Sequence, residues 1–337
     1  MGSSVSLIGR GWADHGPLVN LTADAAGRFR ARPVGASLKG IVRAMAGPIR
    51  TSAPGRADGP GRPAELTSEE VGWLAWHEAR SHALIGREVR DLGDAVLLHD
   101  ETDREPFWNR IAGVAWPAAP SAFDRRLTEA LALFAGLDRV PHVWPMPGFD
   151  EPSDLTARLL ANGFEDFGGG LLMAFDPALA APHTDRPNEP SISLERLHRL
   201  TGEPAAEAAR AIATVLLTSF MVEAERRVAI ELEAVLGLAT DEYHAILVRV
   251  DGKPAAVARR TTFAGASYLS SIGTDPAFQG RGLGRLVTSV ALADALADGS
   301  RWTYLGVFEE NAVARRMYGS LGFVAIGGVA PDLLLRP

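Results

Sequence analysis

Near the C-terminus, the run Gln279–Gly284 (Gln-Gly-Arg-Gly-Leu-Gly) lies between an apolar, strand-like segment and an amphipathic helix. Its three alternating glycines let the chain turn tightly without a Cβ, so that successive backbone N–H groups can converge on one ligand. The helix that follows adds its own unpaired N–H groups and the positive end of its dipole. The pattern therefore predicts an anion site, whose natural occupant is a phosphate or pyrophosphate.

This run differs from two common phosphate motifs. A dinucleotide-binding fold would place an Asp or Glu at the end of a second strand about 20 residues further on, but Leu305-Gly306-Val307 occupies that region. A P-loop requires Gly-Lys-Ser/Thr, which this run lacks. Taken alone, the glycines leave open a tight turn that binds nothing.

The segments around the run have regular hydrophobic patterns. Apolar residues recur at helical spacing after the run, and Asn311 is a plausible N-cap for a second helix that ends near Leu321. The pattern predicts helices at Pro204–Ser219 and Glu223–Gly237, and strands at Tyr243–Val250, Pro254–Phe263, Ser267–Thr274, Trp302–Phe308 and Phe323–Val329. This order predicts an α/β domain that begins with an antiparallel hairpin and continues through a parallel crossover.

The chain also repeats itself at a constant offset of 159 residues. Leu155–Gly169 (LTARLLANGFEDFGG) aligns with Ala314–Gly328 (ARRMYGSLGFVAIGG), and the neighbouring elements align at the same offset. This agreement indicates a duplication. The first copy has Pro120–Arg125 where the second has Gln279–Gly284, so it has lost every glycine of the run.

Composition divides the chain into four parts. Residues 1–63 hold nine Lys or Arg against three Asp or Glu and are rich in Gly and Pro, which predicts a disordered basic tail. Four prolines in 176–190 predict a linker. We therefore expect one domain at 64–175 and a second at 191–337.

Several features occur together in the order and spacing found in one family. They are the strand ending Thr274-Asp275-Pro276, the run Gln279–Gly284, the strand Tyr304–Phe308, and the segment Asn311-x6-Tyr318-x2-Leu321-Gly322-Phe323. This combination, over about Ser267–Gly327, resembles the GNAT superfamily of N-acetyltransferases. The resemblance implies two GNAT-like domains of α/β (α+β) class, each with a mixed, mainly antiparallel twisted sheet flanked by helices. The first would be degenerate and the second catalytic.

The resemblance also implies roles for particular residues. The backbone of Gln279–Gly284 would hold the pyrophosphate of acetyl-CoA, and the two strands Ser267–Thr274 and Trp302–Phe308 would splay apart to admit the pantetheine arm. Asn311 would contact that arm, and Tyr318 would protonate the departing thiolate. The implied cofactor-binding residues are Ile272, Gly273, Thr274, Gln279, Gly280, Arg281, Gly282, Leu283, Gly284, Arg285 and Asn311.

Acetyl transfer to an amine needs a base for the amine, an N–H donor for the oxyanion and an acid for the thiolate. The chain has no cysteine, which excludes an acetyl-cysteine relay and favours direct transfer in a ternary complex. Many family members place a Glu on the strand before the glycine run, but this strand offers none. The candidates for the base are Glu309, Glu310, Glu242, His244 or an ordered chain of waters, and we take Glu309 and Glu310 first.

We therefore expect an enzyme that moves an acetyl group from acetyl-CoA to a primary amine of a small molecule or peptide. A non-catalytic acyl-CoA-binding protein is the main alternative, and a nucleotide-dependent oxidoreductase is the third. The net charge of −7 would favour a cationic acceptor. A homodimer is left open.

Other classes are disfavoured. No stretch approaches the roughly 18 apolar residues of a membrane span, and the basic tail lacks the interleaved aromatic residues that stack on nucleic acid bases. The lack of cysteine fits a cytoplasmic protein. His77 and His82 are five residues apart, about 140° around a helix, so we expect no metal between them.

Overall fold

The computed structural model describes residues 66–101, 103–179 and 191–336. The predicted basic tail (1–63) and residues 180–190 of the predicted linker lie outside these residues. In chain order, the elements are α2 (Ser68–Ala83), β1 (Glu88–Asp91), β2 (Val96–His99), η2 (Pro106–Trp108), β3 (Arg110–Ala112), α3 (Pro120–Gly136), β4 (His142–Trp144), α4 (Leu155–Ala161), β5 (Glu165–Phe175), β6 (Ile192–Leu197), α5 (Gly202–Ser219), η3 (Ala224–Arg226), α6 (Arg227–Leu238), β7 (Tyr243–Val250), β8 (Lys253–Phe263), β9 (Ala266–Thr274), η4 (Pro276–Phe278), α7 (Leu283–Ala297), β10 (Trp302–Phe308), α8 (Ala312–Gly319) and β11 (Phe323–Leu334).

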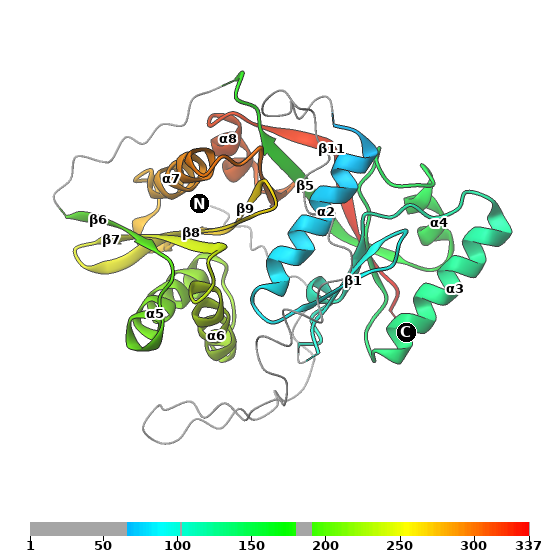
Figure 1. Cartoon of the computed structure of the whole chain (residues 1–337), viewed down its shortest axis with the longest axis horizontal. Coiled ribbons are helices and arrows are strands. Elements are labelled where there is room, and N and C mark those ends of the chain that lie inside the picture. Colours follow the sequence, from blue (N-terminus) through cyan, green and yellow to red (C-terminus); the bar gives the residue numbers. More distant parts are fainter. Residues whose placement is uncertain (1–65, 102, 180–190, 337) are drawn as a thin grey trace.

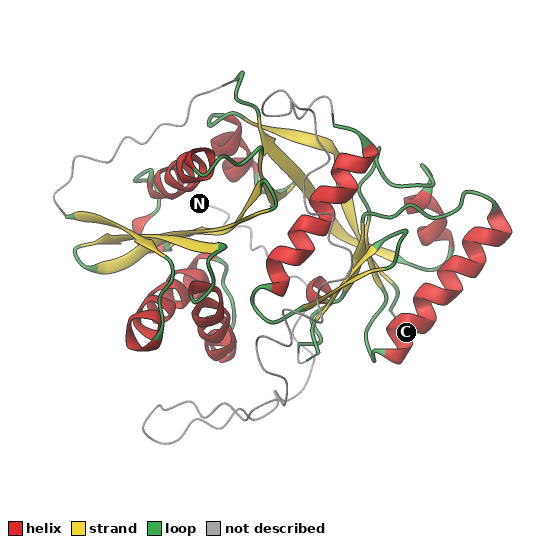
Figure 2. Cartoon of the chain, viewed as in Figure 1, coloured by secondary structure: helices red, strands yellow, loops and turns green. Residues whose placement is uncertain are grey.

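The described strands form one sheet of eleven, in the order β1-β2-β3-β4-β11-β5-β10-β9-β8-β7-β6. Neighbouring strands are antiparallel except in the parallel pairs β3–β4 and β9–β10. Helices cover the sheet on both sides, with α5 and α6 on the face opposite α7 and α8 (Figures 1 and 2). This confirms the predicted fold class, a mixed and mainly antiparallel sheet flanked by helices.

The two halves share this sheet because the last strand of each half pairs with the other half. β5, from the first half, pairs with β10 of the second (Tyr304↔Ala174), and β11, from the second half, pairs with β4 of the first (Leu333↔Val143). β5 and β11 also pair with each other, from Phe323↔Phe175 onward. Figure 1 shows these two strands together where the halves meet. This exchange of strands was not predicted from the sequence.

Successive side chains on the strands point to opposite faces of the sheet, so the second half has one hydrophobic core on each face. On β7, Ala245 and Leu247 pack with α5 and α6, whereas Ile246 and Val248 pack with α7. This is the period of two that a strand covered on both faces must show. The apolar face predicted for the helix after the glycine run is buried in the same core as Ile246.

Helix α2 belongs to the first half but packs against strands of the second. Thr67 starts the helix with a capping box, since its side chain and that of Glu70 each bond to the other's backbone N–H. Further along, Val71, Trp73 and Leu74 are buried with residues of β9, β10 and β11. His77 Nδ1 lies 2.7 Å from the hydroxyl of Tyr304 on β10. The helix is therefore held across the region where β9 and β10 run in parallel.

A buried neutral histidine on α2 makes stability depend on pH. Burial lowers the pKa of His77 from 6.5 to about 3. Below pH 6.5 the unfolded chain gains a proton that the folded chain does not, so the free energy of unfolding falls as the pH drops toward 3. Between pH 6.5 and 5 the expected loss from this group is about 2 kcal/mol.

Urea unfolding at pH 7 and pH 5 measures this loss. Over the interval, His77→Gln is expected to lose about 2 kcal/mol less than the unsubstituted protein, because glutamine has no proton to gain. Equal losses in the two proteins would show that His77 is not the group that titrates.

Candidate active site

The glycine run forms an open turn directly before α7. Gly280 (φ +79°) and Gly282 (φ +74°) are both in the left-handed region, and a Cβ built on either would meet no atom within 4 Å. Gly282 is the N-cap of α7 and, among the described residues, no side chain caps this end. The first N–H groups of the helix are therefore available to an anion.

Two further glycines bring this turn close to the sheet. A Cβ on Gly284 would lie 3.2 Å from Oγ1 of Thr274, at the end of β9. A Cβ on Gly273 would lie 2.3 Å from Oγ of Ser219, at the end of α5, a separation that real Cβ atoms essentially never show. The glycines at 273 and 284 therefore let α5 and α7 pack closely against the end of β9 from opposite faces of the sheet.

Strands β9 and β10 separate next to this turn. They pair in parallel from Trp302↔Ala266 to Leu305↔Leu269 and no further. Beyond that point β9 stays with β8 as far as Thr274, whereas β10 stays with β5 as far as Phe308. Ser271, just past the last pair, has a φ of +49° and lies within two residues of a register irregularity between β8 and β9. The predicted splay between the two strands is present.

Two of the predicted residues belong to α8 and its N-cap. Asn311 is the N-cap of α8, where its Oδ1 accepts a hydrogen bond of 3.0 Å from the backbone N–H of Ala314. Tyr318 is buried in the core beneath α7 and α8, with its ring centroid 6.1 Å from that of Phe323. Burial raises the pKa of Tyr318, so its hydroxyl stays protonated at neutral pH.

The other predicted cofactor residues lie around the glycine turn. Gln279 and Arg281 are exposed, and Leu283 is buried. Arg285, on the first turn of α7, donates a hydrogen bond to the side chain of Ser320 at the end of α8. Ile272 and Thr274 are half-buried on the part of β9 that has left β10. The structure thus brings the glycine turn next to the end of β9 through Gly284 and Thr274, and next to the end of α8 through Arg285 and Ser320.

The four residues predicted as candidates for the general base are exposed or half-buried. Glu309 and Glu310 are exposed just past the end of β10, where the Glu309 carbonyl accepts a 2.8 Å hydrogen bond from Arg315. Glu242 is half-buried just before β7. The ring of His244 stacks on that of His198 at 4.8 Å, and burial together with Arg260 lowers the pKa of His244 to about 4.

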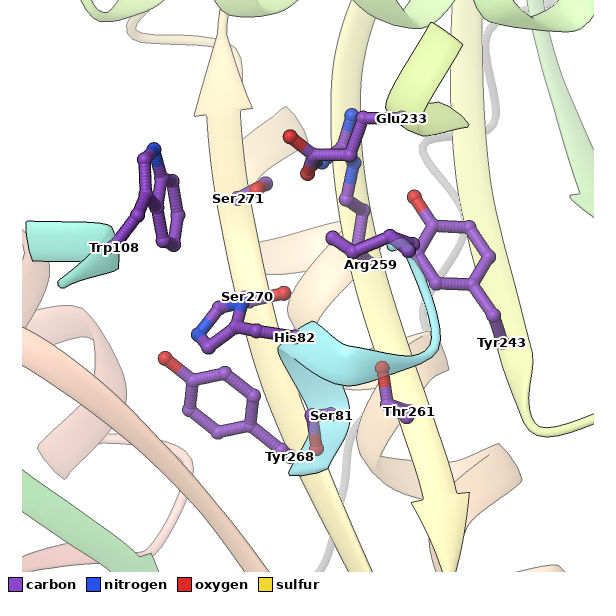
Figure 3. A pocket seen from close by; sticks show the side chains of 11 residues that line it. Ser81, His82, Trp108, Glu233, Tyr243, Arg259, Thr261, Tyr268, Ser270 and Ser271 are labelled. Atoms are coloured by element: carbon purple, nitrogen blue, oxygen red, sulfur yellow. Dashed lines mark hydrogen bonds and ion pairs between the residues drawn. The ribbon is translucent and has the colours of Figure 1, made fainter. Parts of the chain in front are cut away.

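A small pocket lies on the opposite face of the sheet, between α2, α6 and strands β7 to β9 (Figure 3). The residues that line it are Ser81, His82, Ile85, Trp108, Glu233, Tyr243, Arg259, Thr261, Tyr268, Ser270 and Ser271. None of the four predicted base candidates is among them. Ser270 and Ser271 are the first residues of β9 past its last pair with β10, so the pocket reaches the point where the strands separate.

The pocket contains buried charge and unused donors. Glu233 Oε1 lies 2.5 Å from Nη1 of Arg259, an arginine that is 3% exposed. Nε and Nη2 of Arg259 and the hydroxyl of Tyr243 have no hydrogen-bond partner among the described residues. Buried polar atoms are rarely left without partners in native proteins. The pocket is therefore polar, with an ion pair and donors that the described residues leave unpaired.

A second ionic cluster adjoins the pocket on its α2 side. Glu78 Oε1 lies 2.8 Å from His82 Nε2, and Arg110 Nη2 donates to both oxygens of Glu78 at 2.7 and 2.6 Å. This cluster was not predicted from the sequence. The spacing of Glu78 and His82, four residues apart on a helix, was a signal for the pair, but nothing in the sequence placed them beside β9.

Part of the chain matches a known protein family. Residues 210–323 match the model of the acetyltransferase (GNAT) family. No curated protein matches the chain. The fold is similar to that of a GCN5-related N-acetyltransferase from Kribbella flavida, with 22% identity and a TM-score of 0.57 over 79% of this chain and 95% of that chain.

Two more solved structures share the fold. A tandem GNAT protein from the clavulanic acid biosynthesis pathway has 15% identity and a TM-score of 0.55 over 88% of this chain and 95% of its own. A GCN5-related N-acetyltransferase from Sphaerobacter thermophilus has 16% identity and a TM-score of 0.52 over 83% and 95%. Residues 210–323 therefore form a domain of the acetyltransferase (GNAT) family, and the chain shares the fold of these solved structures.

Proposed function

We propose that this chain is an N-acetyltransferase that moves an acetyl group from acetyl-CoA to a primary amine of a small molecule or peptide. The observation that carries the proposal is the separation of β9 and β10 past Leu269↔Leu305. On one face of the sheet the opening leads to the N-terminus of α7, which no described side chain caps, and on the other it meets the pocket at Ser270 and Ser271. Donor and acceptor can therefore approach one point from opposite faces.

The pyrophosphate of acetyl-CoA would lie on the backbone of residues 279–284, with Arg285 close by. The open space at Gly280 and Gly282 fits a group that must approach the backbone closely. The pantetheine arm would then lie between β9 and β10, along residues 272–274 and near Asn311. Backbone N–H groups of β9 that no longer face β10 are the natural donors to the thioester oxyanion.

The acceptor amine would occupy the pocket, where the unpartnered donors of Arg259 and Tyr243 could bind oxygen atoms of its carrier. Direct attack on the thioester suits this arrangement, because the sequence holds no cysteine to carry the acetyl group. The same lack of cysteine fits action in the cytoplasm. In the described residues no helix is long and apolar enough to span a membrane.

Two measurements test this function. Acetyl-CoA is expected to raise the melting temperature, since a ligand that binds only the native state stabilises it. Free CoA should then be released faster when a panel of primary amines is added. Binding without faster release on any amine would favour a non-catalytic acyl-CoA-binding protein. Stabilisation by a dinucleotide but not by acetyl-CoA would contradict the proposal.

Tyr318→Phe tests the acid for the departing thiolate. We expect kcat to fall by about 100-fold, because the variant lacks the proton that the hydroxyl supplies. The dissociation constant for acetyl-CoA should change little, since phenylalanine keeps the packing of the ring against Phe323. The rate of CoA release at saturating acetyl-CoA gives kcat, and calorimetric titration gives the dissociation constant. An unchanged kcat would remove Tyr318 from the mechanism.

A further inference from the structure

The first half of the chain, which has lost the glycine run, contributes a wall of the pocket in the second half. Helix α2 lies between the two halves in Figure 1. Its buried residues Val71, Trp73 and Leu74 pack against β9 and β10 and hold it there. The last turn of α2 then places Ser81 and His82 in the pocket lining. Figure 3 shows the His82 ring at the pocket, near Tyr268 and Ser270.

The ring of His82 is held in one orientation. Its Nε2 lies 2.8 Å from Oε1 of Glu78, and both side chains are mostly buried. Burial alone would raise the pKa of Glu78, but the opposing effects of Arg110 and His82 lower it to about 2, so this group is a carboxylate. A carboxylate only accepts hydrogen bonds, and Nε2 must therefore carry the proton. Nδ1 is left as the basic atom of the ring.

Charged and titratable groups face His82 from four elements and one loop. They are Glu78 on α2, Arg87 in the loop after it, Arg110 on β3, Tyr268 on β9 and Glu233 on α6. Burial lowers the pKa of His82 most, Glu78 opposes this, and Arg87 and Arg110 lower the pKa further. The net direction is downward from 6.5, so the ring is neutral at pH 7. A neutral imidazole with a free nitrogen can accept a proton.

We propose that His82 is the general base of the acetyl transfer, with Glu78 and Arg110 as the residues that position it. This inference rests on the proposed function of the site. The amine nitrogen attacks the thioester carbonyl carbon and forms the amide bond, while its proton passes to Nδ1 of His82. The carbon–sulfur bond breaks, its electron pair goes to sulfur, and the thiolate takes a proton from the Tyr318 hydroxyl. Solvent then removes the proton from His82 and returns one to Tyr318.

The location of the pocket supports this assignment over the exposed glutamates. The pocket includes Ser270 and Ser271, the first residues past the last β9–β10 pair, where the proposed thioester would lie. His82 lines the same pocket, whereas Glu309 and Glu310 follow β10 and are exposed to solvent. A base that faces the acceptor pocket can take a proton from the amine before the amine reaches the thioester.

The test uses the full chain and three variants, His82→Gln, Glu78→Gln and His77→Gln. His77 is a matched control, because it is a buried histidine on the same helix that contacts Tyr304 and Phe263 and does not line the pocket. CoA release is measured from pH 5 to 8 with ethanolamine, putrescine and a tripeptide with a free N-terminus. Release to water alone is measured alongside, because activation of water would need the same base.

We expect His82→Gln to lower kcat/KM by about 100-fold or more and to remove the fall in rate on the acid side of the pH profile. Glu78→Gln should move that acid limb to lower pH, since the carboxylate raises the pKa of His82. His77→Gln should keep both the rate and the acid limb of the pH profile, even if the substitution lowers the stability of the fold. A purely structural role for Glu78 would lower activity without moving the limb.

The inference is overturned if His82→Gln keeps kcat/KM within about threefold of His77→Gln, or keeps the acid limb. It is also overturned if Glu309→Gln or Glu310→Gln removes the limb instead. The rise in melting temperature with acetyl-CoA, measured on each variant, separates a folding defect from a catalytic one. No rise in the unsubstituted protein would overturn the proposed function as well, whereas a rise with a fully active His82→Gln would overturn only the role of His82.

Discussion

Replacing Gly282 with Asp is expected to weaken acetyl-CoA binding by at least about 100-fold while the chain stays folded. The position has room for a side chain, because no atom lies within 4 Å of a Cβ built there. Asp is among the few residues that tolerate a left-handed backbone, and a carboxylate at a helix N-cap stabilises the helix. The same carboxylate would lie where the pyrophosphate binds and would repel it.

Gly282→Asn is the matched control for this effect. Asparagine has the same shape, tolerates the same φ of +74° and can cap α7, but it carries no charge. We expect its affinity for acetyl-CoA to stay within about tenfold of the unsubstituted protein. Calorimetric titration of all three proteins gives the comparison. Equal losses in the two variants would mean that space, not charge, governs the site, and no loss in either would place the pyrophosphate elsewhere.

The second half of the chain, residues 191–337, is expected not to fold when it is expressed alone. Strand β5 of the first half contributes Leu171, Met173 and Phe175 to the core that contains α7. Burial of each such side chain is worth about 1.5–3 kcal/mol, so their loss removes roughly 5–9 kcal/mol. A whole domain has a stability of only about 5–15 kcal/mol. The edges of β10 and β11 would also lose their partner strand.

Co-expression of residues 1–179 and 191–337 as separate chains is the control. The two pieces should assemble into a complex that acetyl-CoA stabilises, since every strand would again have its neighbours. Circular dichroism and thermal unfolding report folding in each case. If residues 191–337 alone unfold cooperatively at the temperature of the full chain, the exchanged strands are not essential to the core.

Much of the second half could be predicted because its patterns are local. The strands Tyr243–Val250 and Trp302–Phe308 have the predicted bounds, and the predicted N-cap Asn311 caps α8. Period-two alternation and capping residues depend on near neighbours in sequence, which a single chain reveals. The glycine turn and the helix after it were predicted on the same grounds.

The parts that escaped prediction depend on pairing between distant segments. β5 and β11 look like the last strands of two separate sheets, and only the folded chain shows that each pairs with the other half. The edge strand β6, Ile192–Leu197, is nowhere fully buried, so it carries little alternation to detect. His82 could be placed on a helix, but its pocket is built from α6 and β7 to β9. The sequence alone therefore could not identify His82 as a candidate for the general base.

A crystal structure of the full chain with CoA would test the central claim most directly. We expect the pyrophosphate to accept hydrogen bonds from the backbone N–H groups of residues 280–284 and the pantetheine arm to lie between β9 and β10. The sulfur should then lie near Tyr318, with the pocket of His82 opening toward it across the sheet. Pyrophosphate bound elsewhere, or β9 and β10 closed against the arm, would contradict this account of the site.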